Sequence, residues 1–352
     1  MTTYSPDFEL NHPAALIAAL PAVLGFVPEN SLVLVSLGDG ELGAVMRVDL
    51  SDDLIDRVDH LVEIAAAAAP EAMIAVIVDA DGAHCPQCNS EYRQLCAVLS
   101  KALAQNDIEL WAAHVVDRVA VGGRWHCVDG CGSGGAVDDP SASPLAAAAV
   151  LQGRRLYPRR ADLQAVIAPD DLSRSAAVVA AASQHAARRA VAHREDPLAC
   201  GRRDVEDAMA AAARVARGQS VSDAEVAALG CALRDVQVRD TLYALAVSEK
   251  AGEAETLWAL LARTLPAPWR VEALVLLAFS AYVRGDGPLA GVSLEAALRC
   301  EPDHRMAGML DTALQSGLRP EQIRELAITG YRMAKRLGVR LPPRRASGRC
   351  AG

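Results

Sequence analysis

Short apolar runs alternate with helical spacings of apolar residues over the first part of the chain. Apolar runs bounded by turn residues are typical of buried strands, and helices are indicated where leucine, isoleucine or valine recurs every three to four residues. Four strands are predicted, over residues 31–37, 42–50, 72–79 and 108–116. Three helices are predicted, one from the Asn11 cap to Leu24 and two over 51–70 and 90–105.

The turn chemistry between these elements predicts a mixed sheet. Gly38-Asp39-Gly40-Glu41 favours a tight hairpin, so the first two strands are expected to be antiparallel. The later alternation of strands and helices predicts parallel crossovers. Gly122 and Gly123 are predicted to turn the chain back through Arg124-Trp125-His126, and the Gly/Ser/Asp-rich stretch that follows, as far as Asp139, is predicted to be a loop. The N-terminal part is therefore expected to be an α/β domain, a mixed sheet with flanking helices.

From Ala146 onward the pattern is helical, and prolines and glycines mark the breaks between helices. Ser222 and Glu225 form a capping box, which predicts the start of another helix. Pro268 and Pro302 lie 34 residues apart, and each closes a pair of candidate helices. This pattern resembles a tetratricopeptide repeat, in which small residues lie where two helices cross. On one helix of the pair the pattern consists of Leu274, Leu277 and Ala278, and on the other of Ala290, Leu294 and Ala297, with the larger residues filling the gaps.

Length and periodicity together predict two domains and a tail. An α/β domain is expected over 1–170, and an all-α, tetratricopeptide-like helix-hairpin domain over 171–340. Residues 341–352 hold prolines and arginines but little apolar surface, so a disordered tail is expected.

Charge and composition restrict the partners and the compartment. The chain has 35 basic and 44 acidic residues and a net charge of −9, which disfavours nucleic acid and anionic membrane surfaces as partners. No basic residue precedes Arg47 and no apolar run reaches the roughly 18 residues of a membrane span, so a cytoplasmic protein is expected. Nine cysteines, an odd number, fit a reducing compartment.

Three stretches resemble a bacterial family, the domain of unknown function 4192. They are LGFVPENSLVLVSL at 24–37, SPLAAAAVLQGRRLYPRRADL at 143–163, and the stretch 273–318, which contains RGDGPLAGVSLEAALRCEPDH. The resemblance implies no activity. It does imply a cysteine-rich loop near Trp125, where this chain has Cys127 and Cys131.

The strongest chemical signal is His84-Cys85-Pro86-Gln87-Cys88, which lies between a predicted strand and a predicted helix. Two thiols separated by two residues can close a redox-active disulfide, because the helix N-terminus favours the thiolate of Cys85. The arrangement resembles the thioredoxin and glutaredoxin site. In those folds a proline before a later strand flanks the dithiol. Residues 108–124 contain no proline, so this chain departs from that pattern.

The same cysteines also fit a structural zinc site. Cys85 and Cys88 would supply one half of the site, and Cys127 and Cys131 the other, with His84 or His126 able to replace one cysteine each. A hairpin through Trp125 could bring the two loops together. The third alternative is that these thiols are ordinary packing or idle residues.

Common catalytic motifs are absent from the sequence. It contains no G-x-x-x-x-G-K-[ST], no G-x-G-x-x-G after a strand, no G-x-S-x-G and no H-E-x-x-H. We therefore expect a non-enzymatic binding or scaffold protein, with a protein or peptide partner at the helical domain. The alternative is a thiol-dependent or zinc-dependent protein centred on Cys85 and Cys88.

Overall fold

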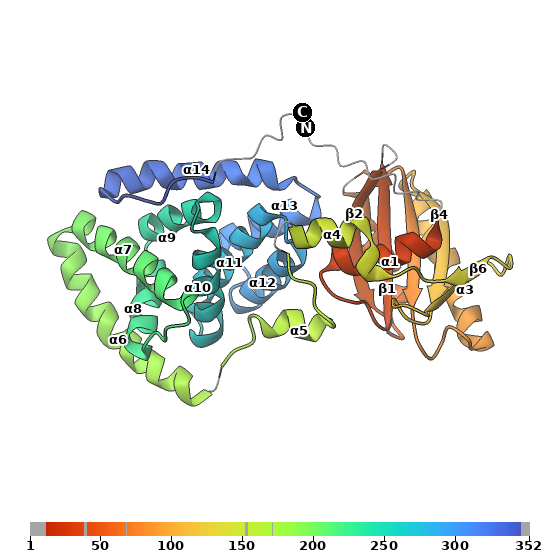
Figure 1. The fold of residues 1–352 in the computed structure, drawn as a ribbon, viewed down its shortest axis with the longest axis horizontal. Helices are drawn as coiled ribbons and strands as arrows, with labels where there is room; N and C mark the ends of the chain where they lie inside the picture. Colours follow the sequence, from red (N-terminus) through yellow and green to blue (C-terminus); the bar gives the residue numbers. More distant parts are fainter. Residues whose placement is uncertain (1–11, 39–40, 68, 152–153, 171, 346–352) are drawn as a thin grey trace. The chain divides into compact units, whose positions relative to one another are not determined.

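The computed structural model describes residues 12–38, 41–67, 69–151, 154–170 and 172–345, and the chain forms two compact units (Figure 1). The first unit extends to Leu163, and the second consists of Gln164–Leu314 and the chain from Leu318 onward. The first contains a six-stranded mixed sheet with helices, and the second is helical, as the sequence predicts. The predicted Asn11 cap and the turn residues Asp39 and Gly40 lie outside the described residues.

The sheet is built on the apolar runs of the sequence. Six of the seven residues of β3 are buried, and β1 is buried from Ser31 to Leu37. The strand order is β2-β1-β3-β4-β5-β6. The strands are β1 (Ser31–Gly38), β2 (Glu41–Asp49), β3 (Ala72–Val78), β4 (Glu109–Val116), β5 (Arg124–Cys127) and β6 (Gly134–Ala136).

Both helical connections in this sheet join parallel strands, as predicted. β3 and β4 pair in parallel and are joined by α3 (Pro86–Ala104). β2 and β3 are each antiparallel to β1, so they run in the same direction with β1 between them. The carboxyl ends of β3 and β4 therefore meet at one edge of the sheet, where α3 begins.

Helices lie against the sheet in layers. α2 (Val58–Ala66) and α3 bury their apolar side chains against one face, which Leu34, Ala75 and Val115 help to form. Alternate residues of the same strands, such as Val33 and Val76, point to the other face and are fully buried as well. On this side lie α1 (Pro13–Leu24) and α4 (Pro144–Leu151), which pack against each other (Figure 1).

Two local predictions near the cysteines were wrong. The stretch predicted as loop contains β6, which pairs with β5 through Gly134 and Gly135. A Cβ at Gly134 would come within 2.8 Å of the Trp125 carbonyl oxygen, so glycine permits this close pairing. Because glycine has no side chain, the sequence shows no alternation of apolar and polar residues that would predict this strand. Helix α3 begins at Pro86 rather than near residue 90, because proline is suited to the first helical position and Cys85 acts as the N-cap.

The second unit is a stack of helices in which α11 is almost wholly buried. α11 and α12 form the predicted hairpin, and the six residues of the predicted pattern are all buried. The capping box of Ser222 and Glu225 is also confirmed. A tetratricopeptide architecture is compatible with this packing and stays a prediction. From α5 the helices are α5 (Arg160–Ala165), α6 (Leu172–Glu195), α7 (Pro197–Ala216), α8 (Asp223–Leu233), α9 (Val236–Leu242), α10 (Ala251–Thr264), α11 (Arg270–Arg284), α12 (Gly287–Cys300), α13 (Arg305–Gln315) and α14 (Pro320–Leu337).

Backbone hydrogen bonds explain where the second unit begins and ends. The Asp170 N–H donates to the Arg263 carbonyl at 2.9 Å, and the Arg270 guanidinium donates to the Ile167 carbonyl, so residues predicted for the first domain belong to the second unit. The tail predicted to be disordered is held as far as Arg345, whose N–H donates to the Val247 carbonyl at 2.9 Å. Residues 346–352 lie outside the described residues.

No helix in the described part of the chain is both long enough and apolar enough to cross a bilayer.

Candidate functional site

Cys85 and Cys88 lie on the first turn of α3, at the edge of the sheet where β3 ends. Cys85 is the N-cap, and its Sγ accepts a hydrogen bond from the Cys88 backbone N–H at 3.5 Å. Pro86 occupies the first helical position. Both thiols are free and half-buried, so they are open to a reaction partner. The structure thus places a dithiol at a helix N-terminus, as the C-P-x-C spacing predicts.

The two thiols of this pair differ in acidity. Hydrogen bonds from the backbone N–H and the side chain of Cys88 lower the pKa of Cys85. The pKa of Cys88 is raised because its side chain is hydrogen-bonded to Cys85, and burial and the nearby charge of Asp79 add to the effect. The helix N-terminus supplies partial positive charge in the same direction for Cys85. Cys85 is therefore the more acidic thiol of the pair and the one that ionises first.

Asp79 lies beside this pair and is held in its ionised form. Burial raises the pKa of Asp79, but hydrogen bonds from Tyr92, Gly82 and Asp81 outweigh burial, and the net pKa is lowered. The Tyr92 hydroxyl donates to Asp79 Oδ2 at 2.5 Å, and the Gly82 N–H donates to Oδ1 at 2.9 Å. A Cβ at Gly82 would collide with the Tyr92 hydroxyl and the Asp79 carboxylate, so a larger residue there would displace these side chains.

Asn89 ties the dithiol turn to β5. Its amide nitrogen donates to the carbonyls of Cys85 at 2.8 Å and Ala83 at 3.0 Å. Its Oδ1 lies 2.8 Å from His126 Nε2, and an amide oxygen can only accept, so this imidazole nitrogen carries the hydrogen. Burial and the neighbouring His84 lower the pKa of His126. His126 thus acts as a neutral donor here, and the backbone around Cys85 is held in place.

The structure does not bring the four predicted zinc thiols together. His126 is paired with Val115, so its side chain points to the α3 face of the sheet. Cys127 is the next residue of the strand and points to the opposite face, where it is aligned with His114. Cys127 lies with Cys131 and Asp129, and among the described residues this is the one group of three or more possible metal ligands within 4.8 Å. Cys85 and Cys88 are not members of this group.

The other described cysteines offer no comparable chemistry. Cys96 is buried, and burial raises its pKa to about 11. Cys200 and Cys231 are also buried, and burial raises the pKa of each. Cys300 is an exposed thiol on α12.

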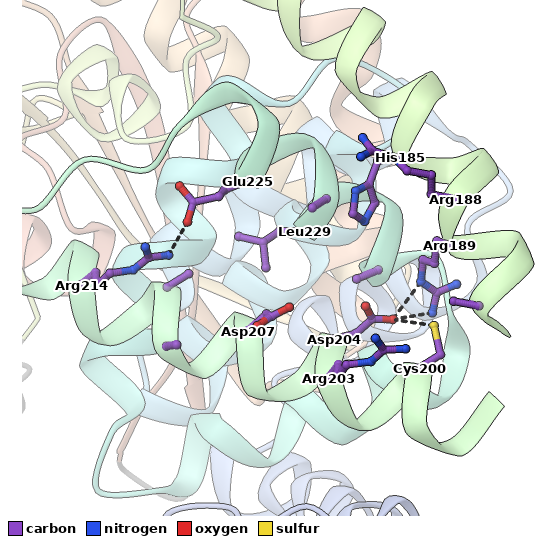
Figure 2. Close-up of a pocket in the computed structure, with 15 residues that line it drawn as sticks. His185, Arg188, Arg189, Cys200, Arg203, Asp204, Asp207, Arg214, Glu225 and Leu229 are labelled. Carbon is purple, nitrogen blue, oxygen red and sulfur yellow. Dashed lines mark hydrogen bonds and ion pairs between the residues drawn. The ribbon is translucent and has the colours of Figure 1, made fainter. Parts of the chain in front are cut away.

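A pocket of about 630 Å³ opens in the helical unit between α6, α7 and α8 (Figure 2). Arg189 anchors one end, donating to Asp204 Oδ2 and to Asp235 Oδ2, each at 2.8 Å. Burial raises the pKa of Asp204, although Arg189 opposes this. At the other end Arg214 donates to Glu225 Oε1 at 2.7 Å.

The unpaired charges of this pocket are mainly positive. Arg188 and Arg203 line it, and neither has an ion-pair partner among the described residues. Asp207 is the unpaired acid of the lining, and burial lowers the pKa of the nearby His185. Alanines and Leu229 form the apolar part of the wall. A small ligand with an anionic group is the chemistry that these side chains suit.

Several of these residues escaped sequence reasoning. The pocket arginines lie on two helices, so only the packing of α6 on α7 assembles them. His114 and Cys127 are brought together by strand register, which a single sequence does not state. Asp129 offered a readable signal, because Cys127, Asp129 and Cys131 alternate along the chain.

Comparison with known proteins identifies the family and nothing more specific. No curated protein matches the chain, and no solved structure matches it. One family model, Domain of unknown function (DUF4192), matches residues 13–321. That match spans most of both units, so the chain belongs to this family.

Proposed function

We propose that Cys85 and Cys88 form a redox-active dithiol that exchanges with disulfides. One observation carries the proposal: Cys85 is the N-cap of α3 and accepts the Cys88 N–H, with the second thiol on the same turn. The lowered pKa of Cys85 and the raised pKa of Cys88 support a division into an attacking thiolate and a resolving thiol.

The reaction uses only the two thiols and a substrate disulfide. The Cys85 thiolate attacks one sulfur of the substrate, forming a mixed disulfide, and the other substrate sulfur leaves as a thiolate that takes up a proton. Cys88 then loses its proton and attacks Cys85 Sγ, which releases the second substrate thiol. The substrate disulfide is reduced to two thiols, and Cys85 and Cys88 are oxidised to a disulfide. Two molecules of a small thiol reverse both steps and are themselves oxidised to a disulfide.

Asp79 adds to the difference in acidity between the two thiols. The pKa of Cys88 is raised mainly by its hydrogen bond with Cys85 and by burial, and the charge of the ionised Asp79 carboxylate acts in the same direction. Asp79 is a positioning residue rather than a base, because its hydrogen bonds already stabilise the anion.

Trapping the mixed disulfide tests this proposal. The Cys88→Ser variant lacks the resolving thiol, so treatment with glutathione disulfide is expected to leave one glutathione on Cys85. The Cys85→Ser variant is expected to take up far less at Cys88. Wild-type protein should instead form the Cys85–Cys88 disulfide without retained glutathione. Peptide mass mapping distinguishes the three products.

The matched control is Cys300→Ser, which removes an exposed thiol from the other unit. It is expected to behave as wild type at Cys85. Equal glutathionylation of Cys85 and Cys88 in the two single variants, or a wild-type pair that stays reduced, would overturn the proposal.

A second candidate role is ligand binding by the helical unit, favoured by the pocket between α6, α7 and α8. The two arginines without ion-pair partners support a small molecule carrying an anionic group. Such a role fits the binding class expected from the sequence. A protein or peptide partner at the hairpin of α11 and α12 stays a prediction.

Citrate, a small tricarboxylate, serves as the probe in isothermal titration calorimetry. The Arg188→Ala/Arg203→Ala variant is expected to weaken citrate binding by more than about tenfold, which is the loss of one to two charge-assisted hydrogen bonds. Arg194→Ala/Arg217→Ala is the matched control, because it removes equal charge from exposed positions near the same helices but outside the pocket. Equal loss in both variants, or no binding by wild type, would rule out the anion site.

A further inference from the structure

The hairpin between β5 and β6 brings two thiols and a carboxylate close together. Gly130 and Gly132 adopt φ values of 76° and 88°, which bend the loop so that Cys131 returns to Cys127. One ligand atom each from Cys127, Asp129 and Cys131 lies within 4.8 Å of the others. Nothing in the proposed dithiol chemistry uses these three residues.

Backbone contacts hold the loop in this shape. The Cys131 N–H donates to Asp129 Oδ1 at 2.9 Å, so the carboxylate is oriented toward the cysteine turn. The Cys127 N–H donates to the Ser133 carbonyl at 2.9 Å, which closes the hairpin. The ligand atoms are thus brought together by the fold itself, and little reorganisation remains for binding.

A buried imidazole nitrogen without a partner gives an independent indication of a ligand. His114 lies opposite Cys127 across the β4–β5 ladder and is 6% exposed. Its Nδ1 is buried and has no hydrogen-bond partner, although its ring packs edge-on against Trp125 with centroids 5.2 Å apart. Leaving a buried polar nitrogen unsatisfied is costly, so such an atom calls for an explanation.

We propose that Cys127, Asp129 and Cys131 bind one zinc ion, and that His114, which does not belong to the 4.8 Å group, moves toward them to become the fourth donor. Thiolate sulfur and imidazole nitrogen are ligands that bind zinc in preference to calcium or magnesium, and a carboxylate completes a four-coordinate set. The site stands on the opposite face of the sheet from Cys85 and Cys88 and does not depend on their chemistry.

Cobalt titration of reduced, metal-free protein tests this site, because thiolate ligands give Co²⁺ a charge-transfer band and tetrahedral geometry gives visible bands. One Co²⁺ per chain is expected, and Zn²⁺ should bleach the bands. Cys131→Ser, at an exposed position, is expected to weaken cobalt binding by more than about tenfold and to reduce the charge-transfer band. Asp129→Asn retains an oxygen acceptor for the Cys131 N–H and should weaken binding through the lost charge.

The Cys85→Ser/Cys88→Ser variant is the matched control, and its cobalt spectrum is expected to equal that of wild type. His114→Gln is expected to weaken binding by about tenfold to a hundredfold if it folds, and Cys131→Ser carries the test if it does not. A wild-type protein without the charge-transfer band would overturn the proposal. So would a band that is lost when Cys85 and Cys88 are replaced, since that result would mean a shared four-thiol site.

Discussion

Cys85 and Cys127 belong to two cysteine pairs of similar spacing that one sheet holds in opposite settings. Cys85 caps a helix and is surrounded by hydrogen-bond donors, which lower its pKa. Cys127 ends a strand, where burial and hydrogen bonds with Asp129 and Cys131 raise its pKa to about 12. The local balance of donors and acceptors, rather than the spacing of the cysteines, therefore sets the acidity of each pair. The first pair suits exchange with a disulfide, and the second suits a metal ion because Asp129 lies with Cys127 and Cys131 in one group of possible ligands.

The largest expected difference lies in the pH profile of Cys85 alkylation by iodoacetamide. The thiolate is the reactive form, so the rate should rise with pH and level off above a pKa that is lower than that of an ordinary thiol. The groups that face Cys85 are Cys88 and Glu91 on α3, with Asp79 and Tyr92 behind them.

Replacing Cys88 by alanine sharpens this prediction. The variant lacks the thiol that donates to Cys85, so the midpoint of the Cys85 profile should move to higher pH. Cys300→Ser should leave that midpoint unchanged. A Cys85 midpoint at or above the value of an ordinary thiol would contradict the difference between the two pairs.

A smaller effect is expected from Gly82→Ala, measured by urea unfolding. The new Cβ collides with the Tyr92 hydroxyl and the Asp79 carboxylate, so unfolding free energy should fall by about 1–3 kcal/mol. The midpoint for Cys85 alkylation should also shift, because Asp79 is displaced. Gly130→Ala is the matched control: it strains a left-handed position in the other loop and should leave the Cys85 profile intact. Equal changes in the Cys85 profile for both variants would contradict the difference between the two cysteine pairs.

The smallest effect is expected from Tyr92→Phe. Asp79 loses one donor but keeps the N–H groups of Asp81 and Gly82, so the unfolding free energy should fall by about 1 kcal/mol. Loss of the hydroxyl should also raise the pKa of Asp79. Urea unfolding with carboxyl titration by NMR measures both. An unchanged stability together with an unchanged Asp79 titration would show that the hydrogen bond does not hold this carboxylate.

The fold was predictable wherever side chains carried a pattern. The runs in β1 and β3 are apolar because both faces of the sheet are covered, and the hairpin of α11 and α12 shows helical spacing. β6 was missed because Gly134 and Gly135 have no side chains to alternate. The hydrogen bond from the Arg345 N–H to the Val247 carbonyl was not predicted, because backbone hydrogen bonds do not affect the hydropathy of a sequence.

The candidate sites were only half predictable for a related reason. Cys85, Pro86 and Cys88 are neighbours in sequence, so spacing alone indicates a dithiol at a helix start. The four-thiol zinc site required knowing which face each strand residue takes. His126 and Cys127 point to opposite faces, and this alternation separates the two pairs.

One measurement tests most directly whether the two pairs have different chemistry. Protein loaded with one equivalent of zinc is treated with glutathione disulfide, and disulfides are then mapped by mass spectrometry while released zinc is measured. The account predicts a Cys85–Cys88 disulfide, with Cys127 and Cys131 still reduced and the zinc retained. Zinc release with a Cys127–Cys131 disulfide while Cys85 and Cys88 stay reduced, or a disulfide joining the two pairs, would contradict it.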